Sequence, residues 1–155
     1  MKFSHIEDDR ARMVDISGKN DVLRRATATG EIQLKPETID AIRNKEIEKG
    51  SVLETARIAS VLAIKNTSSV IPMCHQIPLT GIDVQFELGV ENVKVIVEVK
   101  SVGKTGVEME ALHGVSVALL AIWDMVKSVE KDGTGNYPST KIKNILVIEK
   151  IKGQR

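Results

Sequence analysis

Two groups of charged residues in one long apolar segment are the first candidates for chemistry. The segment opens with GKTGVEMEAL at residues 103–112 and later carries WDMVK at residues 123–127. Glu108 and Glu110 stand near its start, and Asp124 and Lys127 lie three residues apart near its end. Charged groups on a mostly buried helix cost free energy unless they are paired or used. We therefore look for chemistry on this segment first.

The polar residues of this helix are expected to share one side. At 100° per residue, four polar residues and one leucine fall in a narrow stripe between aliphatic neighbours: His113, Ser116, Leu120, Asp124 and Lys127. One interpretation is a solvent-facing stripe, in which Asp124 and Lys127 form a weak surface ion pair. The other is a site, because the apolar arc is too wide for one sheet face and predicts packing on a second subunit. A lysine beside an aspartate can exchange protons there if burial lowers its pKa.

A second candidate is the segment Met73-Cys74-His75. Two flanking prolines, Pro72 and Pro78, predict that it is extended and held in a defined shape. Cysteine beside histidine suggests a metal pair or a thiolate nucleophile, but the chain has one cysteine and no second ligand at a suitable spacing. We expect substrate contact instead, with His75 as hydrogen-bond donor to a phosphate or a base edge. This segment thus favours substrate contact over metal binding or covalent chemistry.

Other charged residues say little when taken one at a time. Lys49 precedes an expected helix start, and both it and Lys65 are ordinary exposed lysines on composition alone. One of the adjacent Arg24 and Arg25 is expected to face an anion. Acidic residues in a first helical turn are favoured by the helix dipole in any case, which gives Glu108 and Glu110 an ordinary structural explanation.

Hydrophobic periodicity predicts the elements that position these residues. The expected order is a strand with a bulge at Gly30, two helices, two hairpin strands, the long helix and a last strand: 26–34, 36–45, 52–65, 82–88, 93–99, 107–130 and 142–151. With the first short helix as an addition, this is β-α-β-β-α-β. We predict an α+β, ferredoxin-like fold with a four-stranded antiparallel sheet and helices packed on one face. Residues 1–21 are expected to be an N-terminal arm, and residues 22–155 one domain.

Composition limits the classes of partner. The 155 residues carry a net charge of +1, which gives no general case for binding nucleic acid or a membrane. Aromatic residues make up 3% of the chain, so the core must be aliphatic. Cys74 is the single cysteine and fits a reducing compartment. No secretory signal or run of 18 apolar residues is present, so we expect a cytoplasmic protein.

Taken together, the motifs resemble one enzyme family. The matching blocks occur in order at residues 13–17, 49–50, 55–59, 71–75, 103–112 and 124–127. They are similar to cyclic pyranopterin monophosphate synthase, the second enzyme of molybdenum cofactor biosynthesis, over about residues 12 to 131. The resemblance implies a lyase that converts 3′,8-cyclo-7,8-dihydro-GTP, made from GTP by a separate radical enzyme, to cyclic pyranopterin monophosphate and pyrophosphate. It also implies a hexamer of three dimers, active sites at the dimer interface, and no metal or organic cofactor.

The resemblance also implies residue roles. Asp124 and Lys127 match the catalytic pair, and Lys49 matches a lysine required for turnover. The residues that match the family's substrate-contacting segments are Met73, Cys74, His75, Met109 and Glu110. Those that match further pocket positions are Lys65, Arg24, Asp15 and Glu108. The chain departs after the long helix, where many relatives have a glycine-containing loop and an RLLxKSGGKSG-type tail. This chain has residues 133–144 followed by a short tail, residues 145–155.

Two readings from other classes compete with this one. A non-catalytic nucleotide-binding or regulatory module of the same topology would need anion contacts but no buried pair of Asp124 and Lys127. An RNA-binding domain would need exposed aromatic side chains on the central strands, where Phe86 is the single aromatic residue.

Overall fold

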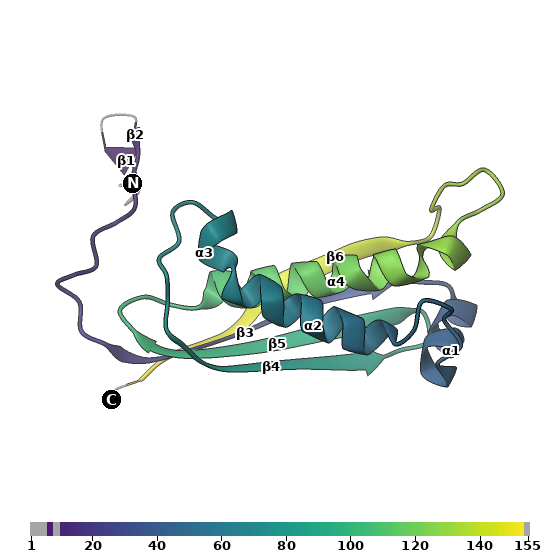
Figure 1. Cartoon of the computed structure of the whole chain (residues 1–155), viewed down its shortest axis with the longest axis horizontal. Helices are drawn as coiled ribbons and strands as arrows, with labels where there is room; N and C mark the ends of the chain where they lie inside the picture. The colour runs from purple at the N-terminus through teal and green to yellow at the C-terminus, as the bar shows by residue number, and fades with distance from the viewer. Residues whose placement is uncertain (1–5, 8–9, 154–155) are drawn as a thin grey trace.

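A four-stranded antiparallel sheet with the order β4-β5-β3-β6 forms the base of the molecule. The structure, a computed structural model, describes residues 6–7 and 10–153. The four strands are β3 (Val22–Gln33), β4 (Leu79–Leu88), β5 (Asn92–Gly103) and β6 (Lys141–Lys152). Helices α2 (Val52–Lys65) and α4 (Glu108–Glu130) lie side by side across one face of the sheet (Figure 1). This arrangement confirms the predicted ferredoxin-like fold.

Three short elements lie outside this plan. Helix α1 (Pro36–Asn44) begins at the predicted proline, whose fixed φ suits a first helical turn. Helix α3 (Thr67–Val70) was not predicted, because a single turn is too short to show a helical period. Strands β1 (Ile6–Glu7) and β2 (Arg10–Ala11) pair antiparallel within the predicted arm, and two-residue strands show no alternation either. Residues 1–5, 8–9 and 154–155 lie outside the described part of the chain.

The core is aliphatic, as the composition predicts. Inward-facing side chains of β5 are fully buried under the helices, and those of α4 meet them: Val93, Val95, Val97, Val99, Val115, Leu119 and Ile122. A bulge was predicted in β3 at Gly30, but β3 pairs with β5 without a shift there, and the extra residue lies in β6, where Asn144 and Ile145 stand opposite Gly30. Helix α4 is long and apolar enough to cross a membrane by length and composition. Half of its most apolar stretch is buried within the molecule, and core helices meet the same criteria.

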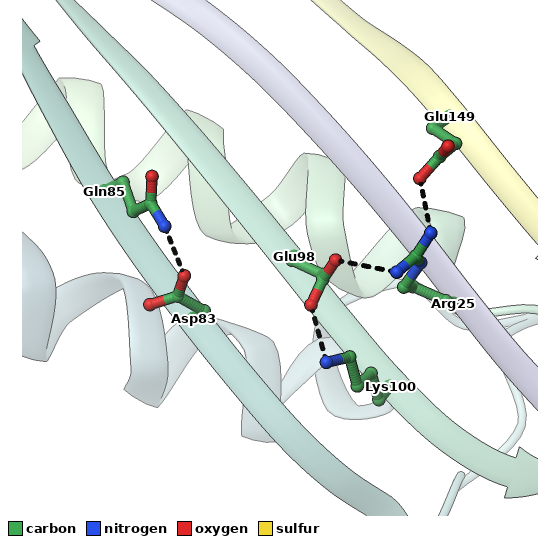
Figure 2. Close-up of polar contacts among 6 residues, drawn as sticks. All are labelled: Arg25, Asp83, Gln85, Glu98, Lys100 and Glu149. Carbon is green, nitrogen blue, oxygen red and sulfur yellow. Dashed lines mark hydrogen bonds and ion pairs between the residues drawn. The ribbon is translucent and has the colours of Figure 1, made fainter.

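The other face of the sheet is polar. Arg25 on β3 contacts Glu149 on β6 at 2.9 Å and Glu98 on β5 at 3.6 Å, and Lys100 contacts Glu98 at 2.9 Å (Figure 2). On the edge strand β4, Gln85 donates a hydrogen bond of 2.6 Å to Asp83. Because these side chains cover the face opposite the helices, the apolar core lies on the helix side alone.

A buried carboxylate joins the two ends of the helical layer. Glu130, at the C-terminal end of α4, is fully buried and accepts hydrogen bonds from the Lys35 backbone N–H at 3.1 Å and from the Thr38 and Thr140 hydroxyls. A carboxylate at the first turn of α1 is favoured by the backbone N–H groups that it meets there. Lys35 Nζ in turn donates to the Val129 carbonyl at 2.9 Å. These contacts hold α1 against α4 and so fix where the following loop, residues 45–51, begins.

Candidate functional site

A cluster of one carboxylate and two ammonium groups lies near the C-terminal end of α4. Lys127 Nζ lies 2.7 Å from Asp124 Oδ1, one helical turn away. Lys49, from the loop before α2, places its Nζ 3.3 Å from Asp124 Oδ2 and 2.7 Å from the Asp124 backbone oxygen. The fold therefore brings Lys49 to Asp124, which lies 75 positions away in the sequence.

The electrostatics of this cluster follow from its hydrogen bonds. The bonds from Lys127 and then from Lys49 hold the pKa of Asp124 below its usual value, because they stabilise the charged carboxylate. The bond to Asp124 raises the pKa of Lys127 for the same reason. All three side chains are exposed in the single chain. The pKa of Lys127 is therefore shifted opposite to the direction that proton release by this lysine needs.

The second group of predicted residues lines a cleft of about 410 Å³ at the other end of α4. The cleft brings together six of these residues, from the segment after α3 and from the first turn of α4: Met73, Cys74, His75, Glu108, Met109 and Glu110. Val14, Ile16 and Lys19 of the arm form another part of its wall, and Lys150 of β6 contributes as well. The predicted substrate-contacting segments thus form one continuous surface.

Glu110 is the unusual member of the cleft. It is 3% exposed, and its Oε2 atom has no hydrogen-bond partner among the residues that the structure describes. Removal from water raises the pKa of Glu110, and the nearby Glu108 carboxylate adds to the shift. Burial likewise raises the pKa of the Cys74 thiol, which makes it a poor nucleophile. The cleft therefore contains a buried carboxyl group whose charged form is disfavoured.

His75 holds the arm against the cleft. Its Nε2 lies 2.7 Å from the Val14 carbonyl oxygen, which can only accept, so Nε2 carries the proton. We expected His75 to donate to a ligand, and in this structure that donor is engaged by the arm. Asp15 is not a lining residue of the cleft, and the backbone N–H of Ser17, 2.8 Å away, lowers its pKa. Lys104 Nζ donates a hydrogen bond of 2.8 Å to the Ser17 carbonyl and so adds a second contact between residues 14–17 and the rest of the chain.

Besides Asp15, two more of the predicted pocket residues lie outside the cleft. The guanidinium of Arg24 points to the backbone carbonyls of Gly103 and Lys104, at 3.5 and 3.3 Å, and so supports the loop that leads into α4. Lys65 lines a separate groove of about 530 Å³, which shares Ile77 with the cleft. Neither residue reaches the first cluster.

The cluster and the cleft are far apart in one chain. Fourteen residues separate Glu110 from Asp124 on the same helix, and at 1.5 Å per residue this is about 21 Å. A nucleotide-sized ligand in the cleft of one subunit would therefore not reach the cluster of that same subunit.

Sequence reasoning missed two residues of the divergent tail. Lys150 on β6 forms an ion pair with Glu108 inside the cleft. At the other end of α4, the ring of Tyr137 packs edge-on against Trp123, with ring centroids 5.5 Å apart and planes at 67°. Strand pairing decides which lysine of β6 faces α4, and the sequence carries no direct signal of that choice.

Among residues 6–7 and 10–153, no three His, Cys, Asp or Glu side chains are grouped as ligands of one ion. A reaction without metal remains a prediction.

The fold and these residues define a ferredoxin-like enzyme subunit with a charged cluster and a polar cleft. The chain belongs to the MoaC family, whose model matches residues 13–153. It is 67% identical over 151 residues to a Methanosarcina acetivorans protein named "Probable cyclic pyranopterin monophosphate synthase", covering 97% of this chain and 96% of the relative. Proteins of the same name from Pyrococcus furiosus and Archaeoglobus fulgidus are 57% and 58% identical, each over at least 98% of both chains. Membership confirms the resemblance and makes the chain an enzyme of molybdenum cofactor biosynthesis.

Proposed function

We propose that this chain is a lyase that converts 3′,8-cyclo-7,8-dihydro-GTP to cyclic pyranopterin monophosphate and releases pyrophosphate. The observation that carries the proposal is the contact of Lys49 and Lys127 with the two oxygens of one Asp124 carboxylate. The three residues match the family's turnover residues and meet only in the folded chain. The names of the relatives support the same reaction.

The chemistry of this reaction asks for such a cluster. Closing a cyclic phosphate requires a substrate hydroxyl to attack the α-phosphorus while the bond to the pyrophosphate leaving group breaks. The hydroxyl must lose its proton, and negative charge collects on the leaving group. In our proposal Asp124 accepts the proton, while Lys49 and Lys127 stabilise the negative charge on the phosphates.

The cleft would hold the ring system of the substrate. In this proposal Met73, Cys74, His75 and Met109 contact the rings, and Glu108 and Glu110 bind their polar edge. Arg24, Lys65 and Asp15 act from neighbouring positions. We propose residues 22–155 as the catalytic domain and residues 1–21 as an arm, in a cytoplasmic enzyme without metal or cofactor and without nucleic acid or membrane partners.

The separation of about 21 Å along α4 leads us to propose that each active site is shared. A cleft from one subunit and a cluster from another would have to meet, as they do across a two-fold interface. Large apolar side chains on the outer surfaces of α2 and α4 support such an interface: Ile58, Leu62 and Leu120 are 61%, 56% and 58% exposed. By resemblance to its family, we propose a hexamer of three dimers.

The direct test is to incubate the purified protein with 3′,8-cyclo-7,8-dihydro-GTP and identify the products by mass spectrometry. We expect the pterin product and one pyrophosphate for each substrate consumed. Substrate that stays intact at micromolar enzyme would refute the proposed reaction.

A complementation experiment tests the shared site separately. Lys127→Ala damages the cluster and His75→Ala damages the cleft, so each variant alone should be nearly inactive. When the two are co-expressed, mixed dimers should contain one intact site each, and about a quarter of wild-type activity should return. A mixture no more active than its parents would place cluster and cleft in sites that lie within one chain. Light scattering on the wild type should show an oligomer at micromolar concentration.

A further inference from the structure

The ion pair between Lys150 and Glu108 is a contact of the cleft for which the function proposed above has no role. Glu108 lies in the first turn of α4, and Lys150 lies on β6, the edge strand of the sheet. Their side chains are 26% and 55% exposed, so the pair is partly shielded from water. It joins the divergent tail of the chain to a motif that is expected to contact substrate.

Strand register explains why Lys150 reaches the cleft. Lys150 pairs with Ala26 of β3, whose side chain is buried on the helix side of the sheet. Directly paired residues point to the same face, so Lys150 points toward α4. Its neighbour Glu149 points the other way and binds Arg25 on the polar face (Figure 2). The alternation along β6 thus places one ammonium group under the start of α4.

The position of the Glu108 carboxylate is a second observation. The carboxylate lies folded back over Gly106, where the side chain of any other residue would collide with it. Glycine thus provides the space, and Lys150 provides the charge that keeps the carboxylate there. Other charged or titratable groups that line the same cleft come from the arm, the segment after α3 and α4: Lys19, Cys74, His75 and Glu110.

We propose that Lys150 is a positioning residue for the reaction: it holds Glu108 over Gly106 so that its carboxylate is in place for the ring edge of the substrate. This inference rests on the proposed function, since Glu108 acts on the substrate only if the cleft binds it. Lys150 itself acts through Glu108 and does not contact the reacting atoms.

The chain offers a matched control for testing this role. Lys152 lies two residues further along β6 and pairs with Arg24, on the same face as Lys150. It is exposed and is not a lining residue of the cleft. Lys150→Met and Lys152→Met therefore remove the same charge from the same strand, and only the first removes the partner of Glu108.

Binding of 3′,8-cyclo-7,8-dihydro-GTP is measured by calorimetry in an Asp124→Asn background, where turnover does not interfere. We expect Lys150→Met to weaken substrate binding about tenfold, which is the scale of one charge-assisted contact. Lys152→Met should change the affinity less than about twofold. Lys150→Arg keeps the charge and should retain most of the wild-type affinity. In a Glu108→Gln background, Lys150→Met should have almost no further effect, because the two residues act as a unit. A further loss there would show that Lys150 binds substrate phosphate directly and would overturn the positioning role. Equal effects of the two lysine variants would overturn it as well.

A crystal structure of Lys150→Met decides the inference without any substrate. We expect the Glu108 carboxylate to leave its place over Gly106. A carboxylate that stays there would refute the inference even if the substrate binds. Conversely, a wild-type protein that binds no substrate would refute the proposed function, while the movement of Glu108 would still show whether Lys150 positions it.

Discussion

Asp124 should behave as the common centre of a three-residue unit, and Asp124→Asn tests this directly. The variant keeps the shape of the side chain and removes its charge. Lys127 Nζ at 2.7 Å and Lys49 Nζ at 3.3 Å contact opposite oxygens of the Asp124 carboxylate, so one substitution disturbs both contacts. Loss of a positioned acid or base lowers turnover by about 10²-fold or more. We expect at least that loss for Asp124→Asn, with substrate binding retained.

The same geometry sets the size of the combined effects. If Lys49→Ala and Lys127→Ala each lower turnover about 10²-fold and act independently, the double variant should lose about 10⁴-fold. Because one carboxylate holds both lysines, loss of any member displaces the others, so we expect the double variant to lose no more than about 10³-fold, and Asp124→Asn to mask most of either loss. The turnover of each variant is measured as the steady-state rate of pyrophosphate release. Losses that multiply to about 10⁴-fold, or wild-type turnover by Asp124→Asn, would refute the reasoning.

Folding should be unaffected by these changes, which separates catalysis from stability. The side chains of Lys49, Lys127 and Asp124 are 43%, 46% and 59% exposed, and exposed ion pairs contribute little to stability. Denaturant midpoints should therefore match the wild type. Lys127→Arg adds a further distinction, because arginine keeps the charge but does not release its proton at working pH. An inactive Lys127→Arg variant that binds substrate would support proton transfer by Lys127, whereas an active one would assign it an electrostatic role.

Two further predictions concern stability and metal dependence. Glu130→Ala should lower the free energy of unfolding by about 3 kcal/mol or more, because it leaves the donors on Lys35, Thr38 and Thr140 unsatisfied, at about 1–3 kcal/mol each. Urea denaturation at fixed subunit concentration measures this loss. Glu130→Gln should lose less stability, because its amide can still form hydrogen bonds with both hydroxyls. Equal losses for the two variants would contradict the hydrogen-bonding explanation. Exhaustive chelation with EDTA should leave turnover unchanged, since Cys74 and His75 have no further soft ligand at a suitable spacing. Loss of activity that a stoichiometric divalent ion restores would overturn the metal-free prediction.

The sequence by itself determined the long elements, the fold class and the family. Alternation at 82–88 and 93–99 and the helical period after residue 107 are local properties of the chain, so β4, β5 and α4 lie where these patterns predicted them. The motifs at 71–75 and 103–112 identified the family because they are long and specific. The stripe on α4 likewise placed Asp124 and Lys127 on one side of a helix, where one turn brings them to 2.7 Å.

The tertiary structure alone decided which distant residues meet. Lys49 reaches Asp124 from the loop between α1 and α2, and no local pattern encodes that contact over 75 residues. Lys150 faces Glu108 because the register of β6 against β3 places it on the helix side, and a shift of one residue would turn it to the polar face. The separation of cluster and cleft along α4 also follows only from the folded chain, since it depends on which side chains the surrounding elements bring to each end of the helix.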